Sequence, residues 1–332
     1  MAETLFLTSE DVAGLATPAE YVDAVREGYR QRGEGAPARP RTRLTTSDPP
    51  GMLTGYTAIL PETGAMGGYM YSAGFGSADA HFVLPLFDAD SGAPLAVFDG
   101  ASMNPLKTGA TGAVGVDALA RADATDLALI GSGSQARGQL RTAVTVRDFE
   151  SVRVYSPTRE HRESFADAMD DELAPDVSAV ASASAAVTGA DVVITATTAS
   201  EPVFDCEDLA DGAHVTCMGQ YHPEKREVDA ETVARSTYVP DLRARVTRDA
   251  GAFLAAREAG LVDDDHVHAE LGAVVAGEAP GRTRDDEVTL FDSGGTAIET
   301  VAAAHLLFER ARERGLGEPV DFLPASQAFD SQ

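Results

Sequence analysis

A glycine-rich segment near the middle of the chain has the spacing of a phosphate-binding loop. Gly131, Gly133 and Ala136 occupy the fixed positions of a G-x-G-x-x-G/A pattern, directly after the apolar run 127–130. In such a unit the first glycine makes a tight turn and the second lets a pyrophosphate approach the backbone. The N-terminus of the following helix favours the negative charge. The predicted dinucleotide contacts in this segment are Gly131, Gly133, Ser134, Gln135 and Ala136.

The end of the next predicted strand indicates which nicotinamide dinucleotide would bind. An NAD site commonly has an acidic residue there, which binds the ribose hydroxyl groups. After Tyr155 this chain has Ser156, Pro157, Thr158 and Arg159 instead. Because hydroxyl groups and an arginine suit a 2′-phosphate, the sequence predicts a preference for NADP(H), with NAD(H) as the alternative. Ser156, Thr158 and Arg159 are the predicted contacts.

The elements around the glycine loop alternate between strands and helices. Short apolar runs begin near 127, 152, 177, 191, 214 and 237, and helix-like segments separate them. This alternation predicts a parallel sheet with right-handed crossovers. The ends of such strands form the cofactor crevice. Further predicted cofactor contacts are Thr108, Thr195, Ala196, Thr197, Met218, Gly219, Ser293 and Gly294.

The flanking segments have a different character. Residues 1–33 predict a helix in which Pro18 follows a Thr17 cap, and 34–51 predict a Pro/Gly/Arg-rich loop. Residues 52–99 predict strands with turns, and 105–121 predict a helix of small residues. A strand from 288, a glycine turn and an amphipathic helix end the pattern, and this last helix is expected to pack against the first part of the chain.

The charge balance excludes several classes of protein. The 332 residues include 53 acidic and 26 basic side chains, giving a net charge of −27. So acidic a chain is repelled by nucleic acid and by anionic lipid, and no apolar run reaches the length of a membrane span. No secretory signal is visible, which predicts a cytoplasmic protein. The acidity favours adaptation to a salt-rich cytoplasm over a cation-binding surface, because molar salt screens self-repulsion.

Cysteine and histidine spacing gives no metal centre. Cys206 and Cys217 lie eleven residues apart with no CxxC pattern, which favours buried free thiols. His266 and His268 form an HxH pair after three aspartates, but no further ligand is placed near them. We therefore predict no bound metal.

Several motifs together resemble the ornithine cyclodeaminase/mu-crystallin family. The matching segments occur in the family's order and span nearly the whole chain: PLFDADSGAPLAVFDGASMNPLKTGATGAVGVDALAR, GSGSQARGQ, ADVVITATTASEPVF, GQYHPEKREVD, ELGAVVAGEAPGR and TLFDSGGTAIET. The resemblance implies an α/β fold with a Rossmann domain, 121–294. It also implies a discontinuous α+β domain for substrate binding and dimerisation, 1–120 with 295–332, and hence a homodimer.

The same resemblance implies a substrate site with changed residues. The family's carboxylate-binding arginine corresponds to Arg41, with Arg43 as a neighbour that could serve. Tyr69 stands at the family's lysine position, and Lys107, one of only two lysines, stands at its second arginine. Its catalytic aspartate corresponds to Tyr221, which His222 follows. We predict that Arg41, Tyr69 and Lys107 bind substrate and that Lys107, Tyr221 and His222 serve catalysis.

The chemistry expected of these residues is hydride transfer at the α-carbon of a small amino or imino acid. Arg41 and Lys107 would fix the carboxylate. His222 could act as a base at neutral pH, whereas Tyr221 suits a proton donor to an imine nitrogen. The prediction is an NAD(P)-dependent dehydrogenase or imine reductase. Two alternatives stay open: an ornithine cyclodeaminase that uses His222 as its base, and a binding protein that holds NADP(H) without catalysis.

Overall fold

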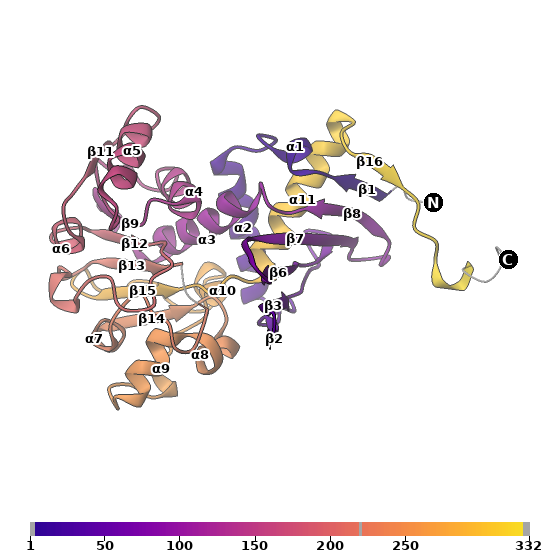
Figure 1. The fold of residues 1–332 in the computed structure, drawn as a ribbon. Helices are drawn as coiled ribbons and strands as arrows, with labels where there is room; N and C mark the ends of the chain where they lie inside the picture. Colours follow the sequence, from indigo (N-terminus) through magenta and orange to yellow (C-terminus); the bar gives the residue numbers. More distant parts are fainter. Residues whose placement is uncertain (1–3, 219–220, 328–332) are drawn as a thin grey trace.

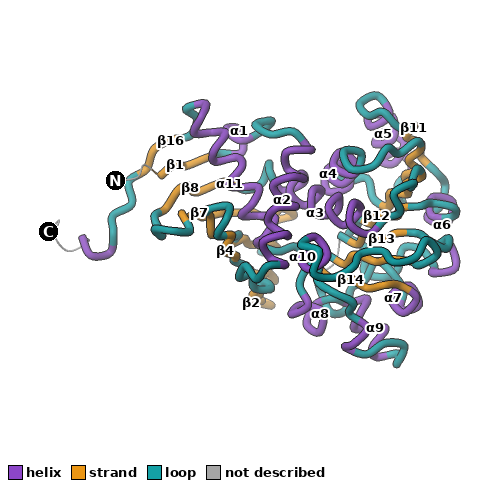
Figure 2. The backbone as a smooth tube through the Cα atoms, turned by 180° about the vertical axis from the view of Figure 1, so that it is seen from behind, coloured by secondary structure: helices purple, strands orange, loops and turns teal. Residues whose placement is uncertain are grey.

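The strands of the protein form two sheets at opposite ends of the molecule (Figure 1). The computed structural model describes residues 4–218 and 221–327, and within them one sheet has nine strands and the other seven. Helices α2 (Pro18–Gly33) and α3 (Asn104–Leu119) lie between the sheets in both views (Figures 1 and 2). In the part of the chain so described, no helix is long and apolar enough to cross a membrane.

The seven-stranded sheet has the order β11-β10-β9-β12-β13-β15-β14. Each pairing described in it is parallel, as the alternation of the sequence predicts. The chain reverses its direction of winding at β9, so a crevice forms at the carboxyl ends of β9 and β12. The strands are β9 (Asp126–Ile130), β10 (Ser151–Tyr155), β11 (Asp176–Ala179), β12 (Val192–Thr195), β13 (His214–Cys217), β14 (Ser236–Pro240) and β15 (Val288–Asp292).

Helices connect these strands and cover the sheet. They are α4 (Ser134–Ala143), α5 (Arg159–Asp170), α6 (Ala183–Val187), α7 (Ala230–Arg235), α8 (Arg243–Asp249), α9 (Gly251–Glu258) and α10 (Leu271–Val275). The parallel strands are almost entirely buried, which is why they occur in the sequence as short continuous apolar runs. The α/β class and the Rossmann-type sheet expected from the sequence are confirmed.

The nine-stranded sheet is mixed and is built from both ends of the chain. Its main path is β16-β1-β8-β7-β6-β3-β2, and β5 joins β4 to β7. The strands are β1 (Thr4–Leu7), β2 (Thr42–Ser47), β3 (Pro50–Gly55), β4 (Ala58–Leu60), β5 (Ala65–Gly67), β6 (Met70–Gly74), β7 (Ser77–Asp88), β8 (Pro94–Asp99) and β16 (Glu318–Val320). The division of the chain at 120/121 and 294/295 stays a prediction, although the two sheets follow it.

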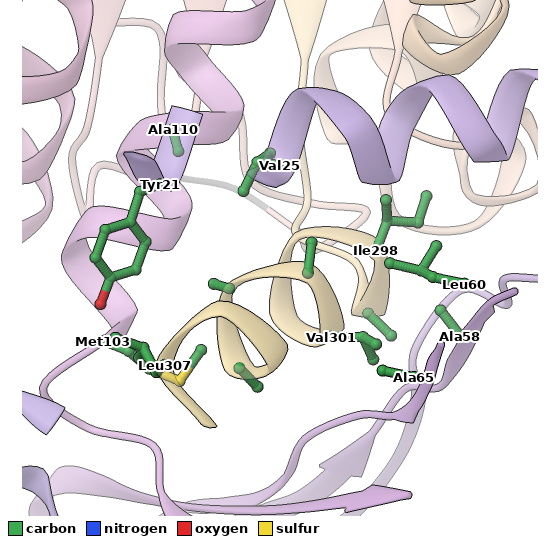
Figure 3. Packing of buried hydrophobic residues seen from close by; sticks show 14 of the residues in the cluster. Tyr21, Val25, Ala58, Leu60, Ala65, Met103, Ala110, Ile298, Val301 and Leu307 are labelled. Atoms are coloured by element: carbon green, nitrogen blue, oxygen red, sulfur yellow. The ribbon is translucent and has the colours of Figure 1, made fainter. Parts of the chain in front are cut away.

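The C-terminal helix α11 (Ala297–Arg314) supplies the core of this half of the molecule. Ile298 lies beside Leu60, and Leu307, toward the other end of the helix, lies beside Met103 (Figure 3). Ala302 also lies against α2, where a Cβ on Gly28 would come within 3.2 Å of it. The helix therefore leaves the seven-stranded sheet after β15 and packs on the first part of the chain, as its amphipathic pattern predicts.

Two local expectations for the N-terminal segments were wrong. Residues 4–7 form β1 rather than a helix, because this strand pairs with β8 on one side and with β16 on the other. A short helix α1 (Ser9–Val12) and a turn then precede α2, which does begin after the Thr17 cap. Residues 42–47 form β2 rather than a loop, because they pair in register with β3. In both segments the pairing with other strands determined the secondary structure.

His214 in β13 makes the stability of the fold depend on pH. Its ring is fully buried, and its two nitrogens lie 2.9 Å from the hydroxyls of Thr289 and Thr216. Burial, followed by the nearby Arg282 and Arg147, lowers the pKa of His214 to about 3. The folded chain therefore binds fewer protons than the unfolded chain between about pH 6.5 and that value.

We expect this histidine to cost stability as the pH falls. Its stabilising contribution is complete above about pH 6.5 and is lost below it, at up to about 1.4 kcal/mol per pH unit. Urea unfolding at constant salt measures the slope. In a His214→Gln variant the amide can still reach both threonines, but no side chain titrates at this position. Between pH 6.5 and 5 its free energy of unfolding should therefore fall less steeply with pH, by up to about 1.4 kcal/mol per pH unit. Equal slopes in the two proteins would contradict the assignment.

Candidate active site

A cavity of about 380 Å³ opens at the carboxyl ends of the parallel strands. The loops after β9, β12, β13 and β15 form one side. The residue before β2, the residue after β3, strands β6 and β7, and the first turn of α3 form the other. The lining residues come from both halves of the molecule: Arg41, Tyr56, Tyr71, Ala73, Ala80, Phe82, Asn104, Lys107, Thr108, Gly133, Ser134, Gln135, Ala196, Thr197, Thr198, Met218, Tyr221, Ser293, Gly294 and Gly295.

The glycine loop is shaped to receive a ligand. Gly131 has a φ of +128°, and a Cβ there would lie 2.4 Å from the carbonyl oxygen of Ala196. A Cβ on Gly133 would meet nothing within 4 Å, so the backbone stays accessible at the start of α4. The Oε1 atom of Gln135 is buried with no hydrogen-bond partner within the described segments. Free helix N–H groups, open space and an unused polar atom fit a dinucleotide phosphate.

Arg41 is a buried cation on the opposite side of the cavity. Its Nη1 donates to the Tyr71 hydroxyl at 2.6 Å, and its Nη2 donates to the Gly294 carbonyl. Its guanidinium carbon lies 3.9 Å from the ring centroid of Tyr221, within the range of cation–π contact. These contacts fix the guanidinium between the two sheets and leave further N–H groups for a ligand.

The loop that receives Arg41 is itself held by a buried charge network. The Oδ2 atom of Asp241 accepts hydrogen bonds from the backbone N–H groups of Gly294 at 2.8 Å and Gly295 at 3.1 Å. Asp241 is paired with Arg245, whose Nε lies 2.6 Å from Oδ1. Arg245 also reaches the carboxylate of Asp292 at 2.6 Å. The network therefore fixes the backbone that positions Arg41.

Lys107 is the second buried cation. It projects from the first turn of α3, and its Nζ lies 3.5 Å from Oε1 of Glu299. Glu299 is buried and also accepts from the Thr296 N–H at 2.5 Å, in the capping box of α11. Burial lowers the pKa of Lys107, and Glu299 acts in the opposite direction. The helix N-terminus and the ammonium group both favour an anion at this end of the cavity.

Aromatic rings form the wall between the cations. Tyr71 packs on Phe82 with ring centroids 4.7 Å apart, and Tyr56 lies edge-on to Tyr71 at 6.5 Å. Tyr221 approaches from the loop after β13 and stacks on Arg41. Ala73 and Ala80 leave space beside these rings. The site therefore combines a phosphate-binding loop, two cations and an apolar wall, which suits a dinucleotide beside a small carboxylate.

The sequence matches the family model of the ornithine cyclodeaminase/mu-crystallin family over residues 2–315. The chain belongs to this family. The resemblance deduced from the motifs is therefore confirmed.

Individual relatives in the family cover most of the chain. A Δ1-pyrroline-2-carboxylate reductase of Bacillus cereus is 34% identical over 72% of this chain and 74% of its own. The same-named enzyme of Thermococcus litoralis, solved with NADH and L-proline, has a TM-score of 0.90 at 32% identity, covering 96% of this chain and all of its own. An archaeal alanine dehydrogenase dimer with bound NAD also has a TM-score of 0.90, at 30% identity over 97% and 100% of the two chains.

The structure brings many of the predicted family residues to the cavity and leaves others outside it. Those that line the cavity are Arg41, Lys107, Thr108, Gly133, Ser134, Gln135, Ala196, Thr197, Met218, Tyr221, Ser293 and Gly294. Gly131, Ala136 and Thr195 lie directly behind the lining, where they shape the loops. Gly219 lies outside the described residues.

Tyr69 and His222 differ from expectation. Tyr69 is buried beneath the cavity, where its hydroxyl donates to the Gly100 carbonyl at 2.8 Å and its ring packs on Phe82. The Nδ1 atom of His222 accepts from the Glu224 N–H at 3.2 Å, and the side chain is not among those lining the cavity. Arg43 does not line it either. The ring of Tyr69 also lies beneath the ammonium group of Lys107, whose Nζ is 5.2 Å from the ring centroid. The substrate and catalytic roles of Tyr69 and His222 stay predictions.

The predicted adenosine end of the site lies beyond β10. Ser156 is buried and accepts a hydrogen bond from the Ser132 hydroxyl at 2.9 Å. Thr158 caps the start of α5 without a side-chain hydrogen bond. Arg159 is exposed and pairs with Glu163 at 2.7 Å. Arg162, which sequence reasoning missed, donates to the Ser156 carbonyl at 3.0 Å and adds a second cation here.

Sequence reasoning also missed several residues that line the cavity. Tyr56, Tyr71, Ala73, Ala80, Phe82, Asn104, Thr198 and Gly295 all do so. Strand alternation signals that Tyr71 and Ala73 share a face of β6, and the register places Tyr71 beside Phe82 of β7. Strand alternation does not show which face of β6 packs against the other half of the molecule. The aromatic wall could therefore not be predicted from the sequence.

The two HxH histidines make no metal centre. The Nε2 of His266 lies 2.8 Å from the Val233 carbonyl, and that of His268 lies 2.8 Å from the Pro280 carbonyl. Across the two described stretches, no group of three or more His, Cys, Asp or Glu side chains is arranged to hold a metal ion.

Proposed function

We propose that the protein is an NAD(P)-dependent oxidoreductase that reduces the carbon–nitrogen double bond of a small α-imino acid, such as Δ1-pyrroline-2-carboxylate. One observation carries this proposal: the glycine loop and the two buried cations, Arg41 and Lys107, face the same cavity. The named activities of the relatives support it. When bound, the reduced nicotinamide supplies a hydride to the imine carbon.

The residues of the chain have separate tasks in this reaction. Arg41 and Lys107 bind the substrate carboxylate and so orient the imine carbon toward the glycine loop. Tyr221 lines the cavity beside Arg41 and donates the proton to the imine nitrogen. His222, the other candidate, lies off the cavity lining. The aromatic wall excludes water from the side chain or ring of the substrate.

The cavity favours this function over the two alternatives. Among its described lining residues there is no carboxylate that could pair with the second ammonium group of ornithine, which argues against a cyclodeaminase. Tyr221 leaves a volume of about 380 Å³ open beside it, within the range of ligand sites, which argues against a protein whose site is closed by its own side chains.

A spectrophotometric panel tests the proposal. Oxidation of NADPH and NADH is followed in molar potassium chloride with Δ1-pyrroline-2-carboxylate, with α-keto acids plus ammonia or methylamine, and in reverse with proline, alanine and ornithine. Turnover of a cyclic or linear imine supports the reductase. Ammonia release from ornithine without net cofactor turnover would identify a cyclodeaminase instead. Cofactor binding without any turnover would favour the binding protein.

For the cofactor, we propose that NADP(H) is preferred and NAD(H) is also accepted. The hydroxyls and the two arginines after β10 support this preference, although the solved relatives named above hold NADH and NAD. We expect Arg159→Ala to raise the KM for NADPH about tenfold and to leave that for NADH within about twofold, because only NADPH carries the 2′-phosphate. Arg141→Ala, which removes a half-buried charge of α4 that pairs with Glu172 at 2.7 Å, is the control. Equal effects on both cofactors would contradict the preference.

We further propose a homodimer formed through the nine-stranded sheet. Leu44, Met70 and Val83 are large apolar side chains that stay exposed on β2, β6 and β7, with 66%, 57% and 52% of their surface accessible. Such a patch is typical of an interaction surface, and the archaeal relative is a dimer. Sedimentation equilibrium in molar potassium chloride distinguishes a dimer from a monomer.

We also propose that the acidic chain is adapted to a salt-rich cytoplasm. With a net charge of −27, self-repulsion opposes the compact state until salt screens it. We expect the free energy of unfolding to rise between about 0.1 M and about 1 M potassium chloride, over which the Debye length falls from about 10 Å to about 3 Å. Urea unfolding at each salt concentration measures this. A flat or falling dependence would contradict the proposal.

A further inference from the structure

Tyr71 lines the cavity but has no role in the reaction proposed above. It lies on β6, buried, with its hydroxyl 2.6 Å from Nη1 of Arg41. A guanidinium has donors and no acceptor, so the Tyr71 oxygen accepts this hydrogen bond. The hydrogen of the Tyr71 hydroxyl is therefore directed to another group.

The Tyr221 hydroxyl is that group. Tyr71 and Tyr221 both contact the guanidinium of Arg41 and line the same cavity, and their side chains are within hydrogen-bonding reach of each other. Burial raises the pKa of Tyr71, and Arg41 acts in the opposite direction without overcoming it, so Tyr71 stays a neutral phenol that can donate. The order of donation is then Arg41 to Tyr71 and Tyr71 to Tyr221. It leaves the hydrogen of Tyr221 free to point into the cavity.

Charged and polar groups surround Tyr221 in the cavity. The guanidinium of Arg41 lies against its ring, with the carbon 3.9 Å from the centroid. Tyr56, which follows β3, and Tyr71 of β6 line the same cavity. From α8, Asp249 acts on Arg41, and from α3, Lys107 lines the same cavity. The Arg41 guanidinium and the Tyr71 hydroxyl thus lie beside Tyr221, where they can stabilise a phenolate that forms during the reaction.

We infer that Tyr71 is a positioning residue that orients the Tyr221 hydroxyl as the proton donor to the substrate nitrogen and stabilises the phenolate left behind. This inference rests on the proposed imine reduction. As the hydride adds to the imine carbon, the π-electron pair moves onto nitrogen and takes the proton of Tyr221. The Tyr221 phenolate accepts the hydrogen bond of Tyr71 and regains a proton from solvent, so the sum is one hydride and one proton per imine reduced.

The test compares Tyr71→Phe, Tyr221→Phe and the double variant in the full-length protein, with NADPH or NADH and Δ1-pyrroline-2-carboxylate. The phenylalanine ring keeps the packing of Tyr71 on Phe82. We expect kcat to fall about a hundredfold in Tyr221→Phe and about tenfold in Tyr71→Phe, whereas KM changes less than about threefold in the latter. The alkaline limb of the kcat–pH profile should move to higher pH in Tyr71→Phe, because the phenolate has lost a donor.

Coupling and rescue separate positioning from mere packing. Tyr71→Phe should have little further effect in the Tyr221→Phe background, and Tyr71→Gln, which can accept from Arg41 and donate to Tyr221, should recover part of the rate. Tyr21→Phe removes another buried phenol of the same core outside the cavity and is the control. Its kcat and pH profile should match the parent.

The possible failures are distinguishable. An active parent with an unchanged kcat and pH profile in Tyr71→Phe overturns the inference and leaves the proposed reaction standing. Full activity of Tyr221→Phe overturns Tyr221 as donor and the role of Tyr71 with it. A parent that reduces no imine of the panel overturns the proposed function itself and thereby this inference. If Tyr71→Phe lowers kcat by the same factor in the parent and in the Tyr221→Phe background, the two residues act independently and Tyr71 has a packing role only.

Discussion

Replacing Arg41 with lysine should raise the KM for the imino acid about a hundredfold, with a much smaller change in kcat. The arginine is held by the Tyr71 hydroxyl on one nitrogen and by the Gly294 carbonyl on another, which fixes the plane of its fork toward the cavity. A lysine keeps the charge but has one nitrogen, so it cannot keep both contacts and still present paired N–H groups to a carboxylate. Loss of one charge-assisted pair costs about 2–3 kcal/mol, or roughly a hundredfold.

Steady-state kinetics with the imine varied at saturating cofactor measure this effect. The KM for the cofactor should change much less, because none of the side-chain contacts described for Arg41 involves the glycine loop 131–136. Arg39→Ala provides a matched control, since Arg39 is an exposed cation two residues earlier in the same segment. A rise in both Michaelis constants, or none in either, would remove Arg41 from the carboxylate site.

The shape of the glycine loop, the proposed cofactor site, could be predicted from the sequence because its chemistry is local. The turn at Gly131, the open backbone at Gly133 and the start of α4 follow from a contiguous motif, and the structure shows the backbone freedom that the motif implies. Arg41 and Lys107 needed more: their order along the chain resembles the family pattern, and the fold then brings both to one cavity. Family membership therefore supplied what spacing alone did not.

The rest of the site depends on which side of a strand meets the other half of the molecule. Tyr69 and Tyr71 are two residues apart, yet Tyr69 turns to the Gly100 carbonyl and Tyr71 turns to Arg41. Tyr69 precedes β6, so strict alternation does not apply to it. Residues 4–7 were mistaken for helix for a related reason, since their strand is decided by β8 and β16, about 90 and 310 residues away. Local sequence contains neither fact.

The network under the Gly294–Gly295 turn was also invisible in the sequence, and it gives the largest expected effect on stability. Arg245 is buried and contacts Asp241, Asp249 and Asp292 at 2.6, 3.3 and 2.6 Å. Burial opposes its charge, but the surrounding carboxylates outweigh burial and raise the pKa of Arg245. Arg245→Met would leave three buried carboxylates around an apolar side chain. We expect the free energy of unfolding to fall by about 3–5 kcal/mol at pH 8, as when one partner of a buried pair is removed.

The dependence on pH distinguishes this cause from a packing defect. Carboxylates that have lost their cation can take up protons, so the loss in Arg245→Met should shrink as the pH falls from 8 to 5, whereas a packing defect would cost the same at both. Urea unfolding in molar potassium chloride measures it, with Arg257→Met as control because that arginine makes an exposed pair with Asp264 at 3.1 Å and should cost at most about 1 kcal/mol. The variant that still folds should also show a raised KM for the imino acid, since Asp241 no longer holds the turn that fixes Arg41. A stable protein with an unchanged KM would mean that the turn keeps its place without the network.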